Sequence, residues 1–298
     1  MLIERLAYVK HRNAVLRRAL WPAVLLRRRW MQRKSQRVPD RLVELLAEDP
    51  ILNVAEFEGI FALSPGSHLF RRIIENGEYE PILTRKCLEL LDPQRDVIDV
   101  GANIGFYTVL LAKHLVRGRV LAVEPTRNAL GRLRRNIALN AVDSKIHVFE
   151  GVVSNRPEWL EIKTVNGLEE YSSLGVMDHP SIAGAQLVAE RVEARTLDQL
   201  VADHGFDCGL VKVDVEGVEH NVFEGGLHTL AQQRPVVVSE LSNYLLCKNG
   251  SSALEVVRFF EALDYVVVDP LHPGEKPGFR EFGDIVCLPR EHARARPT

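Results

Sequence analysis

The sequence predicts an α/β fold with a doubly wound, Rossmann-like sheet that is mostly parallel and ends in an antiparallel strand. An apolar run that ends at Asp99 turns through Gly101 and Gly105 into apolar residues at helical spacing, which is typical of a strand, a tight loop and a helix. A second apolar run leads to Glu124, and strand and helix patterns then alternate almost to the end of the chain. Such alternation is characteristic of a parallel sheet with helices packed on it.

The other elements follow from local patterns along the chain. Residues 51–63 predict two short strands around a turn at Glu58 and Gly59, and residues 81–91 predict a helix that leads into the first core strand. After Glu124 the patterns predict helices over 129–139, 197–204, 218–230 and 253–263, and strands over 146–151, 209–215, 236–241, 265–269 and 285–288.

Residues 158–195 interrupt this alternation. They lack a helical period, and strand-like runs over 159–163 and 188–194 flank a polar tip over 169–175. We interpret the segment as a β-hairpin insertion that folds over the pocket, with Tyr171 to Ser173 near the substrate; a solvent-exposed loop is the alternative. The chain then divides into an N-terminal arm (1–40), an extension with the hairpin and lead-in helix (41–94), a main domain (95–290) and a tail (291–298).

The glycine loop and Glu124 predict a nucleoside pocket. Gly101 and Gly105 let the backbone approach a ligand, and Glu124 at the neighbouring strand tip can accept both hydroxyls of a ribose. A dinucleotide fold needs Gly-x-Gly-x-x-Gly for its pyrophosphate, but Asn103 stands at the middle position. S-adenosyl-L-methionine has no phosphate: its carboxylate suits backbone amides and an Asn side chain, and its cationic groups suit Asp99. The spacing favours this cofactor, with an ordinary strand–helix turn as the alternative.

A series of short motifs lies between about residues 70 and 270. They are Gly77–Pro81, Asp99–Gly105, Glu124-Pro125, Ser172–Leu174, Thr196–Asp198, Lys212–Glu219 and Ser239-Glu240. In this order and spacing they resemble the FkbM family of S-adenosylmethionine-dependent methyltransferases, although Val218 stands where family members usually carry alanine. The resemblance implies a class I methyltransferase fold and O-methylation of hydroxyl groups, often on sugars or natural products.

The resemblance also implies cofactor contacts outside the glycine loop. Tyr79 or Glu80 would touch the methionine end of the cofactor, with a helix-capping turn as the alternative. The adenine is expected near Glu150 to Val153, Val152 included, at the carboxyl tip of the predicted strand over 146–151. Pro125 belongs to the same cofactor motif as its neighbour Glu124.

Acidic residues at the carboxyl end of a predicted strand are the catalytic candidates. Lys212, Asp214 and Glu216 alternate and so point to one face, and the two carboxylates reach the edge where open parallel sheets bind ligands. Methyl transfer to a hydroxyl requires an aligned acceptor oxygen and removal of its proton. Asp214 and Glu216 are the leading candidates for the base, Glu240 is the third and His220 the runner-up. The structural alternative is an ion pair of Lys212 with either leading carboxylate.

The acidic residues at this strand end also bear on metal binding and on the class of acceptor. Asp214, Glu216 and Glu240 could hold Mg²⁺, which would lower the pKa of the acceptor hydroxyl, but nothing in the spacing demands an ion and the metal-free mechanism ranks first. Residues 214–217 offer acceptors and no aromatic ring for stacking, which argues against methylation of exocyclic base nitrogens.

Charge and cysteine patterns limit the classes of partner. Residues 1–40 hold eleven Lys and Arg against two acidic residues, so the net charge of −2 leaves −11 for residues 41–298. Phosphate neutralisation supplies most of the affinity for nucleic acid, so this acidic body gives no reason to expect a nucleic-acid substrate. The four cysteines are widely scattered, which indicates reduced thiols in a cytoplasmic protein and neither a zinc site nor a disulfide framework.

The basic arm, residues 1–40, predicts an amphipathic helix interrupted at Pro22. It contains no run long enough to span a membrane and no signal-peptide cleavage site. Two interpretations stay open: a contact with the body or with a partner subunit in a homo-oligomer, and peripheral association with the inner membrane face, which basic side chains, Trp21 and Trp30 would favour.

Three functions compete. The first is a methyltransferase acting on a hydroxyl of a small-molecule, glycan or glycolipid acceptor. The second is a non-catalytic scaffold with the same fold that docks on a membrane or a partner, and the third is an NAD-dependent oxidoreductase. The intact Asp99, Gly101, Gly105 and Glu124 favour an enzyme, and the missing middle glycine counts against NAD.

Overall fold

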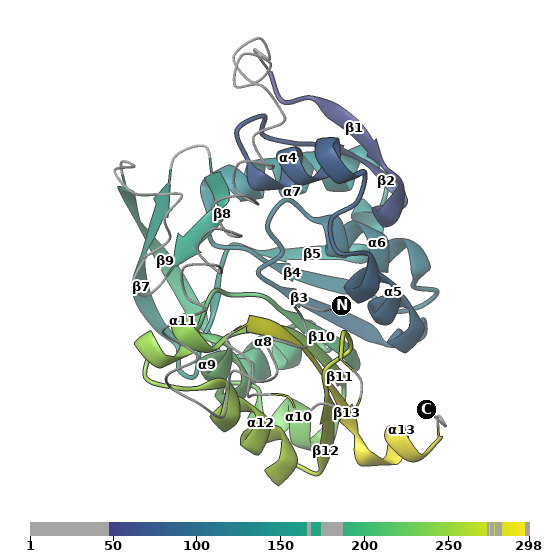
Figure 1. The fold of residues 1–298 in the computed structure, drawn as a ribbon, viewed down its shortest axis with the longest axis vertical. Helices are drawn as coiled ribbons and strands as arrows, with labels where there is room; N and C mark the ends of the chain where they lie inside the picture. The colour runs from purple at the N-terminus through teal and green to yellow at the C-terminus, as the bar shows by residue number, and fades with distance from the viewer. Residues whose placement is uncertain are drawn as a thin grey trace, which may run out of the picture.

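The computed structural model describes residues 48–165, 168–173, 187–272, 274, 277 and 282–295. The predicted N-terminal arm lies outside these residues. In Figure 1 a central sheet has helices on both faces, and a smaller sheet stands beside it. None of the helices in the described ranges has the length and apolarity that a membrane span requires.

The central sheet has seven strands in the order β12-β13-β11-β10-β3-β4-β5 (Figure 1). Five of them run parallel: β3 (Asp96–Val100), β4 (Val120–Val123), β5 (Ile146–Phe149), β10 (Cys208–Val213) and β11 (Val236–Ser242). The last strand, β13 (Phe282–Pro289), is antiparallel to β11 and to β12 (Tyr265–Val268). The predicted fold class is therefore confirmed. Its central strands are buried on both faces and are mostly apolar, with Asp96, Asp99 and Lys212 as buried charged exceptions.

Two layers of helices cover the sheet. One layer contains α4 (His68–Asn76), α5 (Pro81–Leu90), α6 (Phe106–His114) and α7 (Arg127–Leu139). The other contains α8 (Leu197–His204), α9 (Glu219–Glu224), α10 (Leu227–Gln232), α11 (Asn243–Lys248) and α12 (Ala253–Ala262). A short helix, α13 (Arg290–Ala295), follows β13 in what was predicted as a tail. The sequence patterns did not predict α4, α11 or α13.

The prediction of one helix over 218–230 is wrong, because the chain breaks between α9 and α10 at Gly225 and Gly226. A Cβ atom on Gly225 would lie 2.1 Å from the backbone oxygen of Ser154. The backbone of α8 forms a hydrogen bond to the same glycine: the Asp198 N–H donates to the Gly225 oxygen at 3.0 Å. Close backbone packing, and not helix propensity, thus decides where α9 ends.

The N-terminal extension contains the predicted hairpin, β1 (Ile51–Val54) and β2 (Gly59–Ala62), joined by the 3-10 turn η3 (Ala55–Phe57). Glu58 closes the turn in the left-handed conformation, with φ 49°. The buried Asn136 of α7 fastens this hairpin to the main domain: its Oδ1 accepts from the Ala62 N–H at 2.7 Å, and its Nδ2 donates to the Ile104 oxygen at 2.8 Å.

The insertion forms a sheet in the order β6-β9-β7-β8. The predicted hairpin corresponds to β7 (Glu158–Val165) and β9 (Leu187–Arg195), which pair antiparallel over eight positions. The predicted strand 146–151 is split, since β5 stays in the central sheet and β6 (Gly151–Val153) pairs with β9. Part of the predicted polar tip is instead an edge strand, β8 (Leu168–Ser173), paired with β7. The side chains of Tyr171 to Ser173 are outside the described set, so their place near the substrate stays a prediction.

Candidate functional site

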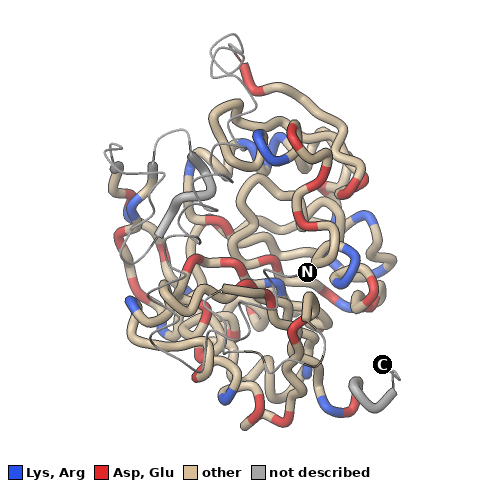
Figure 2. The backbone as a smooth tube through the Cα atoms, viewed as in Figure 1, with Lys and Arg blue, Asp and Glu red and all other residues tan. Residues whose placement is uncertain are grey.

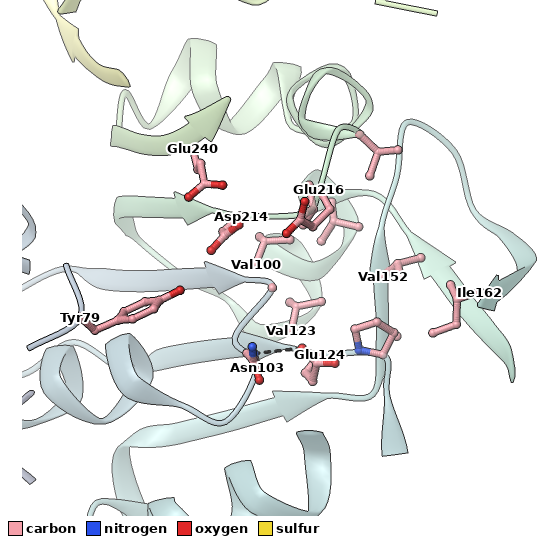
Figure 3. A pocket seen from close by; sticks show the side chains of 16 residues that line it. Tyr79, Val100, Asn103, Val123, Glu124, Val152, Ile162, Asp214, Glu216 and Glu240 are labelled. Carbon is pink, nitrogen blue, oxygen red and sulfur yellow. Dashed lines mark hydrogen bonds between the residues drawn. The ribbon is translucent and has the colours of Figure 1, made fainter. Parts of the chain in front are cut away.

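A pocket of about 130 Å³ lies at the carboxyl ends of the central strands, where the strand order reverses between β3 and β10 (Figure 3). Open α/β sheets bind ligands at such a point. The predicted site residues that line it are Tyr79, Gly101, Asn103, Glu124, Pro125, Val152, Asp214, Glu216 and Glu240. Figure 2 shows acidic positions gathered near these strand ends.

The glycine loop passes very close to the end of β10. Gly101 has φ 80°, and a Cβ atom there would lie 1.9 Å from the backbone oxygen of Asp214. The Asp214 N–H also donates to the Val100 oxygen at 3.0 Å. Gly105, by contrast, is not part of the pocket lining: with φ 92° it permits close packing on Leu133 of α7, and its contact with the cofactor stays a prediction.

Glu124 is 4% exposed and organises the loop beside it (Figure 3). Its Oε2 accepts from the Asn103 N–H at 2.9 Å, and its Oε1 accepts from the N–H and the hydroxyl of Thr126 at 2.9 and 2.7 Å. Burial raises the pKa of Glu124, while these hydrogen bonds oppose the rise. The Oδ1 atom of Asn103 is buried and has no hydrogen-bond partner among the described residues. The pocket therefore presents an acceptor atom without a donor.

Four predicted cofactor contacts lie outside the pocket lining: Gly105, Glu80, Asp99 and Glu150. Asp99 is fully buried beneath it: its Oδ2 accepts from the Thr108 hydroxyl at 2.6 Å, and its Oδ1 lies 3.8 Å from Lys212 Nζ. Glu150 is half-exposed and forms an ion pair with Arg134 of α7. The chain leaves the central sheet at Glu150, and the following strand supplies the lining residues on this side of the pocket, so the contact of Glu150 with the adenine stays a prediction.

Lys212 is the buried cation beneath the acidic side of the pocket, with 4% exposure. Its Nζ lies 3.4 Å from Asp214 Oδ2 and 4.7 Å from the ring centre of Tyr107. Burial lowers the pKa of Lys212, but Asp214 and Asp99 outweigh this and raise it above its ordinary value. Glu80 is not in the pocket lining; it accepts from the Tyr107 hydroxyl at 2.9 Å, on the extension side of this group. The ion pair expected as the structural alternative for Lys212 is thus formed with Asp214.

Tyr79 lines the pocket from the extension, and Glu56 of η3 holds it there. The Glu56 carboxylate accepts from the N–H groups of Tyr79 and Glu80 and from the Thr84 hydroxyl, the last two at 2.7 and 2.8 Å. Glu56 thereby satisfies backbone donors at the start of α5, where Glu80 precedes the first helical residue. The predicted capping turn is present, and its Tyr also faces the pocket.

Glu216 does not continue the strand as predicted, because β10 ends at Val213 and Glu216 lies in a turn with φ 53°. Glu219 holds that turn: its Oε1 accepts from the Gly217 N–H at 2.9 Å. Burial raises the pKa of Glu219 to about 7. Lys212, Asp214 and Glu216 therefore do not form one alternating row, yet the turn still brings both carboxylates to the pocket.

Glu240 of β11 points into the pocket opposite Asp214 (Figure 3). Burial raises the pKa of Glu240 well above its usual value, and Asp214 and Glu216 raise it further. Asp284 of β13 lies directly opposite Glu240 in the antiparallel register, and burial raises its pKa to about 7. Sequence reasoning missed Asp284, because only the pairing of β13 with β11 brings it to this group.

His220 is not part of the pocket lining, and its role as a base stays a prediction. Its Nδ1 lies 2.7 Å from the Ser251 hydroxyl, and its ring packs edge-on against Phe259 of α12. Among the described residues, no group of three or more His, Cys, Asp or Glu side chains is arranged to hold a metal ion. The three carboxylates weighed for Mg²⁺ do not form such a group.

Comparison with known proteins bears on this site. The family model of the Methyltransferase FkbM domain matches residues 99–267, which is more than half of the chain. The chain belongs to the FkbM methyltransferase family. The match begins at Asp99 and takes in the glycine loop, Glu124, the Asp214–Glu216 turn and Glu240.

Relatives of this FkbM methyltransferase are distant. Methyltransferase sdnD of Sordaria araneosa is 26% identical over 173 residues, which cover 49% of this chain and 67% of sdnD. The 2-O-methyltransferase NoeI of Sinorhizobium fredii is 26% identical over 161 residues, which cover 50% of this chain and 65% of NoeI. The AMB antimetabolite synthetase AmbE of Pseudomonas aeruginosa is 27% identical over 165 residues, but the chain spans only 8% of its length. The crystal structure of an FkbM methyltransferase from Methylobacillus flagellatus matches with a TM-score of 0.43 at 18% identity. The match covers 67% of this chain and 45% of the Methylobacillus chain.

Proposed function

We propose that this FkbM methyltransferase transfers the methyl group of S-adenosyl-L-methionine to a hydroxyl oxygen of a carbohydrate, glycolipid or natural-product acceptor. The observation that carries the proposal is one pocket with two unlike halves: the Glu124 and glycine-loop half suits a nucleoside, and the Asp214 and Glu240 half offers carboxylates to an acceptor. The relative NoeI is named a 2-O-methyltransferase, which supports oxygen as the atom that is methylated.

The residues present fit this cofactor. The Glu124 carboxylate is placed to hold ribose hydroxyls, and Val152, Val153 and Ile162 form an apolar wall beside it that suits a purine (Figure 3). The unpartnered Oδ1 atom of Asn103 matches a donor such as the ammonium group at the methionine end. When bound, the cofactor supplies an electrophilic methyl group on a sulfonium.

The carboxylates of the chain would then prepare the acceptor. The Lys212 ammonium beside Asp214 offsets the negative charge of Asp214, which suits a residue that orients hydroxyl groups. Glu240 points into the pocket and, unlike Asp214, forms no ion pair with a described cation, so its carboxylate is the one available to accept the hydroxyl proton. We therefore assign removal of the hydroxyl proton to Glu240, ahead of the two carboxylates that the sequence placed first.

Binding measurements test the proposal before any acceptor is known. Calorimetry should show binding of S-adenosylmethionine and S-adenosylhomocysteine and no binding of NAD, because the loop has Asn103 where a pyrophosphate needs glycine. Tighter binding of NAD than of S-adenosylhomocysteine would overturn the proposal. Transfer of labelled methyl groups to hydroxyl compounds then separates an enzyme from a scaffold that only binds the cofactor.

A further inference from the structure

Carboxylates follow one another along the edge of the central sheet. Glu124 follows β4, Asp214 follows β10, Glu240 lies in β11, and Asp284 lies in β13. In sheet order this row leads away from the nucleoside half of the pocket, with Glu240 in the lining and Asp284 on the next strand outward. The Glu240 and Asp284 end of the row is therefore the end available to an acceptor.

The antiparallel register puts the side chains of Glu240 and Asp284 on the same face of the sheet, as direct neighbours. Like charges at directly opposite positions destabilise a sheet, so the pair requires a physical reason. Within the described residues, no side chain forms a hydrogen bond or ion pair with either carboxylate. Figure 3 shows Glu240 directed into the pocket. Both carboxylates can thus accept hydrogen bonds from a ligand, because no described side chain of the protein donates to them.

Among the residues that the structure describes, few positive charges lie around this pair. The described pocket lining contains no Lys, Arg or His. The cation beneath it, Lys212, lies 3.4 Å from Asp214 and 3.8 Å from Asp99, so its charge is already shared by two carboxylates. Burial and the neighbouring carboxylates raise the pKa values of both Glu240 and Asp284, which is consistent with uncompensated negative potential.

We propose that Glu240 and Asp284 form the acceptor subsite and that this subsite selects hydroxyl-rich acceptors that carry no anionic group. The inference rests on the proposed function and names its substrate class. Carboxylates accept hydrogen bonds from several hydroxyls at once, and the described lining has no cation to receive a carboxylate, phosphate or sulfate. At pH 8, above the pKa of about 7 that burial gives Asp284, an anionic acceptor would be repelled by Asp214 and Asp284, whereas an ammonium group on the acceptor would not. Asp284 is thereby a specificity residue that lies outside the sequence motifs named above.

Three glycosides with one skeleton test the proposal: methyl glucoside, methyl glucosaminide with a free amine, and methyl glucuronide. Their binding to the full-length protein saturated with S-adenosylhomocysteine is measured by saturation-transfer NMR, and methyl transfer is measured in parallel. We expect the first two to bind and the glucuronide to bind at least roughly ten-fold more weakly. The Asp284→Asn variant should reduce this discrimination by about ten-fold, and Glu261→Gln, an exposed carboxylate on α12, should leave it unchanged.

Each remaining outcome is decisive. Equal or tighter binding of the glucuronide, no binding by any of the three glycosides, or unchanged discrimination in folded Asp284→Asn would overturn the subsite. Should Asp284→Asn fail to fold, Asp284→Ser replaces it under the same criterion. Calorimetry with S-adenosylhomocysteine on the wild type separates the two proposals: without cofactor binding the proposed function fails, and with cofactor binding but no discrimination only the subsite fails.

Discussion

At the scale of single residues, the orientation of each side chain decides its role. Glu124 and Glu150 both follow strands of the first half of the sheet, and the sequence pattern favours both as cofactor contacts. In the structure Glu124 is buried against the Asn103 N–H, whereas Glu150 faces Arg134 at the surface. The two residues therefore form a matched pair for experiment.

Replacement of Glu124 by Ala should weaken cofactor binding by about 1 to 3 kcal/mol, because charge-assisted hydrogen bonds to the ribose are lost. The same replacement at Glu150 should leave the dissociation constant within about two-fold of the wild type, since a surface ion pair contributes little. Calorimetry with S-adenosylhomocysteine measures both variants. Equal losses at the two positions would show that Glu124 has no special contact with the ligand.

Replacement of Glu240 by Gln should lower the turnover number by about 10²-fold or more while cofactor affinity stays near that of the wild type, as expected for a base acting in the transfer step. Asp214→Asn should lower turnover as well, because Lys212 then loses its closest carboxylate. His220→Gln serves as the control, since His220 bonds to Ser251 outside the pocket lining. A wild-type rate for Glu240→Gln would remove Glu240 as the base, and activity lost with EDTA and restored by Mg²⁺ would instead favour a metal mechanism.

At the scale of elements, strong local patterns predicted the strands of the central sheet, although the end of β5 was misplaced, and the helices α5, α6, α7, α8 and α12. The buried strand β4 is apolar at all of its positions, so its existence could be deduced without any tertiary information. The division between α9 and α10 could not, because it depends on the backbone of Ser154 approaching Gly225 from another part of the chain.

The same distinction applies to the site. The glycine loop and Glu124 are adjacent to strand ends that the sequence reveals, so that half of the pocket could be predicted. Ile162 and Asp284 reach the site through sheet pairings of the insertion and of β13, and a single sequence shows neither register. The acceptor end of the site was consequently the less predictable half.

Asn136 links two elements and gives a test of that link. Asn136→Ala should reduce the free energy of unfolding by roughly 2 to 4 kcal/mol, because the Ala62 N–H and the Ile104 oxygen would be left buried without their partner. Urea denaturation measures the loss. Arg135→Ala, at an exposed position on the same helix, is the control and should change stability by less than about 0.5 kcal/mol. Similar small effects in both variants would mean that the hairpin does not depend on this contact.

At the scale of the whole molecule, buried carboxyls make stability depend on pH. Burial raises the pKa of Glu219 and of Asp284 to about 7, from ordinary values of 4.5 and 3.8. Between about pH 4 and pH 7 the unfolded chain releases these protons more readily than the folded one, so stability is greatest below this window and falls as the pH rises through it.

The wild type should therefore have a lower free energy of unfolding at pH 8 than at pH 5, with Glu219 alone contributing on the order of 3 kcal/mol to the difference. Glu219→Gln keeps an oxygen for the Gly217 N–H and has no proton to lose, so its stability should depend less on pH. Denaturation at the two pH values checks both statements, with Glu261→Gln as the surface control. A wild type that becomes more stable between pH 5 and pH 8 would contradict the raised pKa values.

The close passage of Gly101 beside Asp214 has a mechanical consequence. Because the two main chains touch there, with the Asp214 N–H bonded to Val100, a shift of the glycine loop has to displace the start of the turn that carries Asp214 and Glu216. In the proposed complex, the separation between the cofactor side of the pocket and this turn would then be set first by main-chain packing and only afterwards adjusted by side-chain rotamers.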